Sequence, residues 1–131
     1  MVNVKVTREN RMEGALNKYY CVFNLAKEEI EEHIGDKIFL GPWNKFIKKS
    51  PQIIPIANGE TISVDIINGQ KNTLFVIMFN IATHTYGNEI TFDNSSLNLS
   101  YVVKTMSDGG SFKPLLFCEK CSIARLKEQD N

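Results

Sequence analysis

Hydrophobic and polar residues alternate along much of this chain with the period of two that a half-buried β-strand requires. Val2, Val4 and Val6 follow this pattern at the start of the chain, and residues 61–66 repeat it. Aromatic and β-branched residues dominate other short runs. Together these patterns predict strands at residues 2–8, 19–25, 61–66, 74–79, 89–92, 97–106 and 113–121.

The same period assigns one face of several strands to the core. We expect a set of apolar side chains to be buried on that basis: Ile62, Val64, Ile66, Leu74, Val76, Met78, Leu99, Tyr101 and Val103.

Two Asn-Gly pairs, Asn58-Gly59 and Asn68-Gly69, mark turns, because both residue types tolerate a positive φ. The strands on either side of Asn68-Gly69 are therefore predicted to form a β-hairpin. The first two strands of the chain are also predicted to pair with each other.

One short surface helix is predicted near residues 26–34, where Ala26, Ile30 and Ile34 form an apolar stripe at i, i+4 spacing. Its glutamates face away from that stripe. Residues 37–55 contain Gly41-Pro42 and two further prolines, which are expected to break any long element and leave an irregular excursion.

Short strands at roughly ten-residue spacing, with one small helix, favour a mainly β fold. We predict a single-domain antiparallel β-sandwich over residues 1–123, with an insertion near 26–55 that holds the helix. Residues 124–131 form a polar C-terminal tail. A chain of 131 residues buries roughly two-thirds of the surface that its unfolded form exposes, so it needs no metal or disulfide to fold.

The order of strand and turn residues resembles small bacterial PEGA-like β-sandwich domains of unknown function. The resemblance rests on Val4 to Arg8, Gly14, Lys18 to Phe23, Ala57 to Glu60, Ile62 to Ile66 and Asn68-Gly69. It covers about residues 2–106, with residues 26–55 as an insertion. It implies architecture rather than activity.

Fifteen basic and fifteen acidic residues give a formal net charge of zero. Such a chain has no overall field to attract nucleic acid or an anionic membrane, so neither is expected as a partner. The longest apolar run, residues 74–79, is far shorter than the roughly 20 residues that a membrane helix needs. The start of the chain lacks the apolar core of a signal peptide, and we read the protein as cytoplasmic.

Cys118 and Cys121 have the C-x-x-C spacing that can hold one tetrahedral zinc when the chain turns between them. Two more ligands would have to come from Cys21, His33 or His84. Ordinary partly buried cysteines are the simpler interpretation, and a redox pair is a third. Three cysteines without an export signal favour reduced thiols.

The excursion is predicted to carry the interaction that is specific to this chain, because loops on a rigid scaffold often hold binding groups. Aromatic residues would supply contact area, with lysines as a rim. The candidate patch consists of Phe39, Trp43, Phe46, Lys45, Lys48 and Lys49. The alternative is that the aromatic residues are buried in their own domain. A surface that stacks nucleic-acid bases is disfavoured by the neutral charge.

No phosphate-binding loop, dinucleotide motif, zinc-protease motif or serine-hydrolase motif is present in the sequence. A nucleophilic pair of Cys21 with His33 or His84 would depend on geometry that sequence does not give. We therefore predict a non-catalytic protein-interaction or self-association module without a cofactor, whose partner is another protein or a second copy in a homodimer. The alternative is a small metal-binding protein that uses the Cys-x-x-Cys pair.

Overall fold

The computed structural model describes residues 2–12, 17–34, 41–66, 71–80, 83–93, 98–108 and 111–119. Nine strands and two helices are described in these ranges. They follow the order β1 (Val2–Arg8), β2 (Lys18–Phe23), α1 (Lys27–Ile34), α2 (Gly41–Lys49), β3 (Ile53–Ile56), β4 (Thr61–Ile66), β5 (Asn72–Phe79), β6 (His84–Tyr86), β7 (Ile90–Phe92), β8 (Asn98–Asp108) and β9 (Ser111–Cys118).

The strands form two sheets, which confirms the mainly β, single sandwich-like domain. Sheet A has four strands in the order β4-β1-β8-β9, and sheet B has the order β3-β2-β5-β6, with β7 also paired to β5. Within the described strands, only the β1–β8 pair is parallel, and the other pairs are antiparallel.

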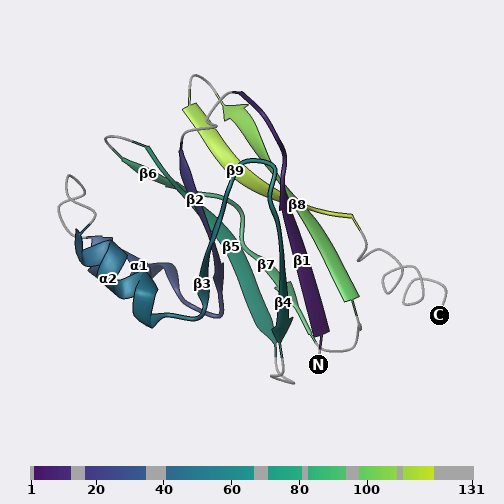
Figure 1. Ribbon diagram of the computed structural model, residues 1–131, viewed down its shortest axis with the longest axis horizontal. Coiled ribbons are helices and arrows are strands. Elements are labelled where there is room, and N and C mark those ends of the chain that lie inside the picture. The colour runs from purple at the N-terminus through teal and green to yellow at the C-terminus, as the bar shows by residue number, and fades with distance from the viewer. Residues whose placement is uncertain are drawn as a thin grey trace.

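The molecule has three layers, in which both helices cover the outer face of sheet B and sheet A lies on its other side (Figure 1). One hydrophobic cluster fills the space between the sheets, and a second fills the space between sheet B and the helices. The central strands of sheet B, β2 and β5, are therefore buried on both faces. This explains why β2 and β5 are almost continuously apolar, whereas β1 and β4 alternate.

The expected core positions are confirmed. Six of the nine side chains are buried between the sheets: Leu74, Val76, Met78, Leu99, Tyr101 and Val103. The other three are on β4 and are partly buried against the same cluster: Ile62, Val64 and Ile66.

The predicted strand pairings are wrong. β4 pairs with β1 in sheet A and β5 pairs with β2 in sheet B, so the strands that flank Asn68-Gly69 do not form a hairpin. For the same reason β1 and β2 are not partners. The turn at Asn58-Gly59 is confirmed: Glu60 N–H donates to the Ala57 carbonyl at 2.9 Å, and Gly59 has a φ of +81°.

The structure has a second helix where an irregular excursion was expected. Pro42 lies in the first turn of α2, where its missing N–H removes no helical hydrogen bond. Trp43 and the partly buried Phe46 and Ile47 lie at i, i+3 and i+4 and face sheet B. The excursion also contains β3, which is an integral strand of sheet B. Among the described helices, none is long and apolar enough to cross a membrane.

Candidate functional site

The outer edge of β3 offers no backbone donor. Phe23 N–H donates to the Gln52 carbonyl at 2.8 Å, so residues 52, 54 and 56 face β2, and Ile53 and Pro55 face outward. Ile53 N–H donates to the Ser50 carbonyl at 3.1 Å, and proline has no N–H. The carbonyl groups of a further strand would therefore find no N–H donor on this edge.

The outer edge of β9 is blocked by the segment between β6 and β7. The side-chain amide of Asn88 makes the two hydrogen bonds that a residue of a neighbouring strand would make. Asn88 Nδ2 donates to the Leu116 carbonyl at 3.1 Å, and Leu116 N–H donates to Asn88 Oδ1 at 2.8 Å. The neighbouring outward position on β9 is Pro114, which packs against Gly87. Gly87 N–H donates to the Val76 carbonyl on β5. This contact joins the two sheets along one side of the sandwich.

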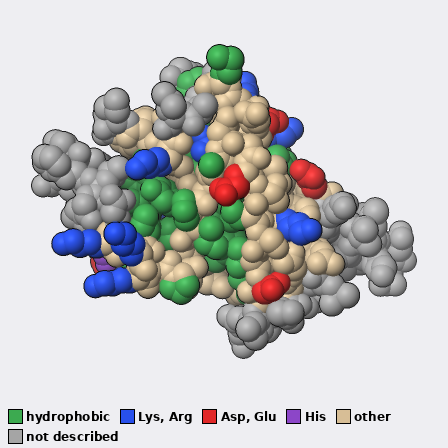
Figure 2. Space-filling model, viewed as in Figure 1, with side chains coloured by type: hydrophobic (Ala, Val, Ile, Leu, Met, Phe, Trp, Pro, Cys, Tyr) green, Lys and Arg blue, Asp and Glu red, His purple; other side chains and the backbone are tan. Residues whose placement is uncertain are grey.

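The outer edge of β4 carries no such block among the described residues. Arg8 N–H donates to the Glu60 carbonyl at 2.9 Å, and because hydrogen-bonded pairs alternate in an antiparallel ladder, the backbone groups of Thr61, Ser63 and Asp65 face outward. None of these residues is proline. Figure 2 shows hydrophobic side chains at the surface along β3 and between β3 and β4, on this open side of the sandwich.

A pocket of about 510 Å³ lies at the end of the sandwich where β1 and β3 end and β2 and β4 begin. We call it the end pocket. Its lining residues include Arg8, Lys18, Tyr19, Ile56 and Glu60. The Arg8 guanidinium lies 3.6 Å from the centre of the Tyr19 ring, and Nη1 donates to the Ile56 carbonyl at 3.1 Å. Burial lowers the pKa of Arg8, an effect that the electrostatic interaction with Tyr19 opposes.

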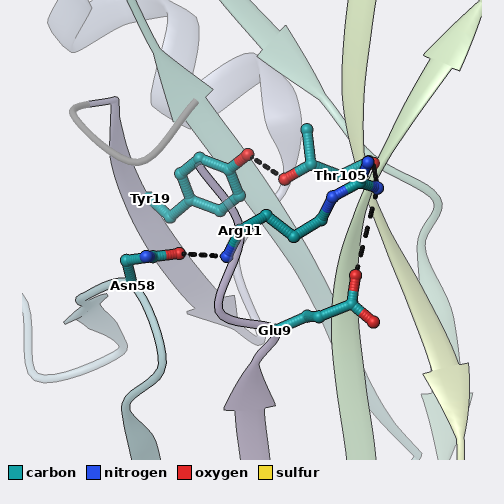
Figure 3. A network of polar contacts seen from close by, with 5 residues as sticks. All are labelled: Glu9, Arg11, Tyr19, Asn58 and Thr105. Carbon is teal, nitrogen blue, oxygen red and sulfur yellow. Dashed lines mark hydrogen bonds and ion pairs between the residues drawn. The ribbon is translucent and has the colours of Figure 1, made fainter. Parts of the chain in front are cut away.

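A polar network fixes the wall of the end pocket (Figure 3). The Tyr19 and Thr105 hydroxyls form a hydrogen bond of 2.5 Å between the two sheets. Arg11 donates from its backbone N–H to Asn58 Oδ1 at 3.1 Å and from Nη1 to the Thr105 carbonyl at 2.8 Å. Glu9 lies 4.0 Å from the same Arg11 nitrogen. The network therefore holds β1, β2, β8 and the β3–β4 turn together.

The described residues of the predicted interaction patch lie in different environments. Trp43 is fully buried, so it belongs to the core of the domain and not to a contact surface. Phe46 is partly buried, and its ring stacks on His33 with a centroid distance of 3.7 Å. Lys45, Lys48 and Lys49 are exposed on α2, where Figure 2 shows a group of basic side chains. Phe39 lies outside the described residues.

The structure does not assemble the predicted metal site from the residues it describes. Cys118 is disulfide-bonded, so it is not a reduced thiol, and its sulfur is not available as a zinc thiolate. Cys121 lies outside the described residues. No group of three or more histidine, cysteine, aspartate or glutamate residues in the described ranges could hold a metal ion.

One histidine lies in α1 and the other contacts it from β6. His33 Nδ1 donates to the Glu29 carbonyl within the helix at 2.8 Å. His84 Nε2 donates to Glu31 Oε1 at 2.7 Å, and the Tyr86 hydroxyl donates to the same oxygen at 2.6 Å. Burial and the hydrogen bond to Glu31 raise the pKa of Tyr86. Glu31 therefore links α1 to β6.

Cys21 is a free, fully buried thiol, so we expect it to be unreactive in the folded protein. Burial, with a smaller effect of the Glu60 charge, raises the pKa of this thiol from 9.0 to about 12. We expect Cys21 to resist iodoacetamide at about pH 8 in the folded protein and to react after denaturation, measured by mass spectrometry of the peptide that contains it. Rapid labelling of the native protein would contradict this burial.

The same thiol affects stability in alkaline solution. The unfolded thiol ionises near pH 9.0, whereas the folded thiol stays protonated to about pH 12. Its contribution to the free energy of unfolding should therefore decrease as the pH rises through this window.

No protein-family model matches the chain, and no curated protein or solved structure shows significant similarity to it. The resemblance to PEGA-like domains therefore stays a prediction. The β4 edge and the end pocket were both missed by sequence reasoning. The alternating pattern of β4 indicated one solvent-facing side of the strand, but no local signal showed that it would lie at a sheet edge.

Proposed function

We propose that the protein is a non-catalytic protein-interaction module that associates with a second copy of itself through the outer edge of β4. The observation that carries this proposal is the contrast between the long edges. Proline and side-chain contacts block the edges of β3 and β9. On β4, three alternate residues, Thr61, Ser63 and Asp65, face outward without such a block in the described chain. Unprotected edge strands are templates for strand pairing.

The sequence of β4 is compatible with pairing to itself. In an antiparallel pair centred on Ser63, each Asp65 lies opposite Thr61 of the second copy, so the two carboxylates are not directly opposed. The same register places Ile62 opposite Val64 of the second copy, and both side chains are partly buried in one copy alone. Pairing would cover this apolar surface further. The zero net charge means that the two copies do not repel each other overall.

Replacing Ser63 by proline tests the proposal. Ser63 N–H faces away from β1, so proline removes an outward donor without removing a hydrogen bond of the β1–β4 ladder. We expect wild-type protein to dimerise with increasing concentration in sedimentation experiments, and Ser63→Pro to weaken dimerisation by at least about tenfold. Circular dichroism checks that the variant is folded.

Ser63→Ala is the matched control, because it removes the same hydroxyl, which accepts a hydrogen bond from Asn3, but keeps the backbone N–H. It should dimerise like the wild type. A wild-type protein that stays monomeric at every concentration, or a dimer that Ser63→Pro leaves unchanged, would overturn the proposal.

A charge-swap pair tests the register and does not depend on proline. Ser63 lies opposite itself in the proposed dimer, so Ser63→Lys and Ser63→Asp should each reduce dimerisation through like charges. Mixing the two variants in equal amounts should restore it. A mixture that remains monomeric while the wild type dimerises would exclude this register.

A further inference from the structure

We propose that Cys118 and Cys121 form a redox-active disulfide that exchanges with small thiols of the glutathione class. Cys118 is disulfide-bonded, Cys21 is a free thiol, and the sequence contains three cysteines. Within one chain, Cys121 is therefore the cysteine that remains to pair with Cys118. The site belongs to β9, at the opposite edge of sheet A from β4, so it does not depend on dimerisation.

Cys118 is accessible to a thiol in solution. It is the last residue of β9 and is exposed, whereas the preceding residues on the same face of the strand, Leu116 and Pro114, are buried. Glu119 N–H donates to the Ser100 carbonyl at 2.8 Å, so the backbone on the far side of Cys118 is still held by β8. Exposed disulfides are more easily reduced than the structural disulfides of secreted proteins, and they are the ones that serve regulatory or catalytic roles.

The position of this disulfide in the chain gives it little value as a structural cross-link. In the chain-entropy model, a disulfide stabilises a protein more when it closes a longer loop. Cys118 and Cys121 are only three positions apart. Cys118 also belongs to neither hydrophobic cluster. Because the bond neither joins distant segments nor fills the core, reduction should leave the fold intact.

Reduction takes two exchange steps and consumes two thiols. The thiolate of the first thiol attacks Cys118 Sγ, the bond between the two cysteines breaks, and Cys121 leaves as a thiolate that takes a proton from water. The thiolate of the second thiol attacks the sulfur of the first in the mixed disulfide and releases Cys118, which is protonated in the same way. Two electrons and two protons thus pass to the protein, and the two small thiols become one small disulfide.

Trapping of thiols in the folded protein with N-ethylmaleimide tests the proposal, and mass spectrometry counts the labels. Protein purified without reductant should take up no label, because Cys118 is bonded and Cys21 is fully buried. After treatment with millimolar reduced glutathione it should take up two labels, on Cys118 and Cys121, and oxidised glutathione should reverse this change. Labelling of either cysteine before reduction, reduction that requires denaturation, or a covalent dimer linked through Cys118 would each overturn the proposal.

Two variants separate a redox role from a structural one. Cys121→Ser removes the thiol that would displace glutathione, so oxidised glutathione should leave a stable mixed disulfide on Cys118, whereas the reduced wild type should re-form its own disulfide. The double variant Cys118→Ser/Cys121→Ser should take up no glutathione and should unfold at nearly the same denaturant concentration as the wild type. A double variant that unfolds at a much lower concentration would identify a structural cross-link and contradict the proposal.

Discussion

Replacing Trp43 by alanine should lower the free energy of unfolding by about 3 to 5 kcal/mol. Trp43 is fully buried between α2 and sheet B, with its ring 5.4 Å from that of Tyr20 and 5.1 Å from that of Phe79. Alanine would leave a cavity in the cluster that fixes the helical layer, and surrounding aromatic rings can close it only in part. This is a large share of the total stability of a small domain.

Chemical denaturation followed by circular dichroism measures this effect without relying on tryptophan fluorescence. Trp43→Phe is the control, because it keeps an aromatic ring at the position and should cost much less. Lys45→Ala changes an exposed residue of the same helix, two positions after Trp43, and should cost almost nothing. An alanine variant at Trp43 that unfolds at the wild-type denaturant concentration would show that the helical layer does not depend on this residue.

Replacing Gly87 by alanine should destabilise the protein by about 2 to 5 kcal/mol. An added Cβ would lie 1.8 Å from the Pro114 carbonyl oxygen, which belongs to the backbone of β9 and cannot rotate away. The segment would have to move from β9. That movement would break the two hydrogen bonds between Asn88 and Leu116 and the bond from Gly87 N–H to Val76.

Gly59→Ala provides a contrast that separates steric overlap from backbone strain. At Gly59 the nearest atom to an added Cβ lies at 3.5 Å, so space is available, but the φ of +81° disfavours any side chain. We expect a cost of about 1 to 2 kcal/mol there. Equal effects at the two glycines would mean that the 87–88 segment is not held tightly against β9.

The Gly87→Ala variant also tests whether the 87–88 segment protects the edge of β9 from pairing with another strand. The 87–88 segment covers the edge of β9, whereas the edge of β4 is uncovered among the described residues. If Gly87→Ala displaces the segment, the outward groups of Leu116 lose their partners, and β9 becomes a second unprotected edge. We therefore expect this variant to form larger assemblies than the proposed dimer, detectable by light scattering.

The alternation of β1 and β4 could be recognised in the sequence because it depends only on the pleat of a strand. The continuous apolar run of residues 74–79 indicates burial on both faces, and β5 indeed lies in the middle layer. The different patterns of residues 61–66 and 74–79 fit their places in different sheets, β4 at the edge of sheet A and β5 inside sheet B.

The sequence by itself located seven of the nine described strands, the side chains of β1, β5 and β8 that face the core, and the turn at Asn58-Gly59, because strand period and positive φ are local properties. It missed β3 and β6. It could not determine which strands pair, since closing a longer loop costs little more than closing a short one, and burial of whole faces decides among the pairings. Tertiary structure alone placed Trp43 in the core beneath α2 and brought Arg8 onto Tyr19 at the end pocket. It also closed β9 with Asn88 and left β4 at an open edge, because each of these outcomes depends on residues far apart in the chain.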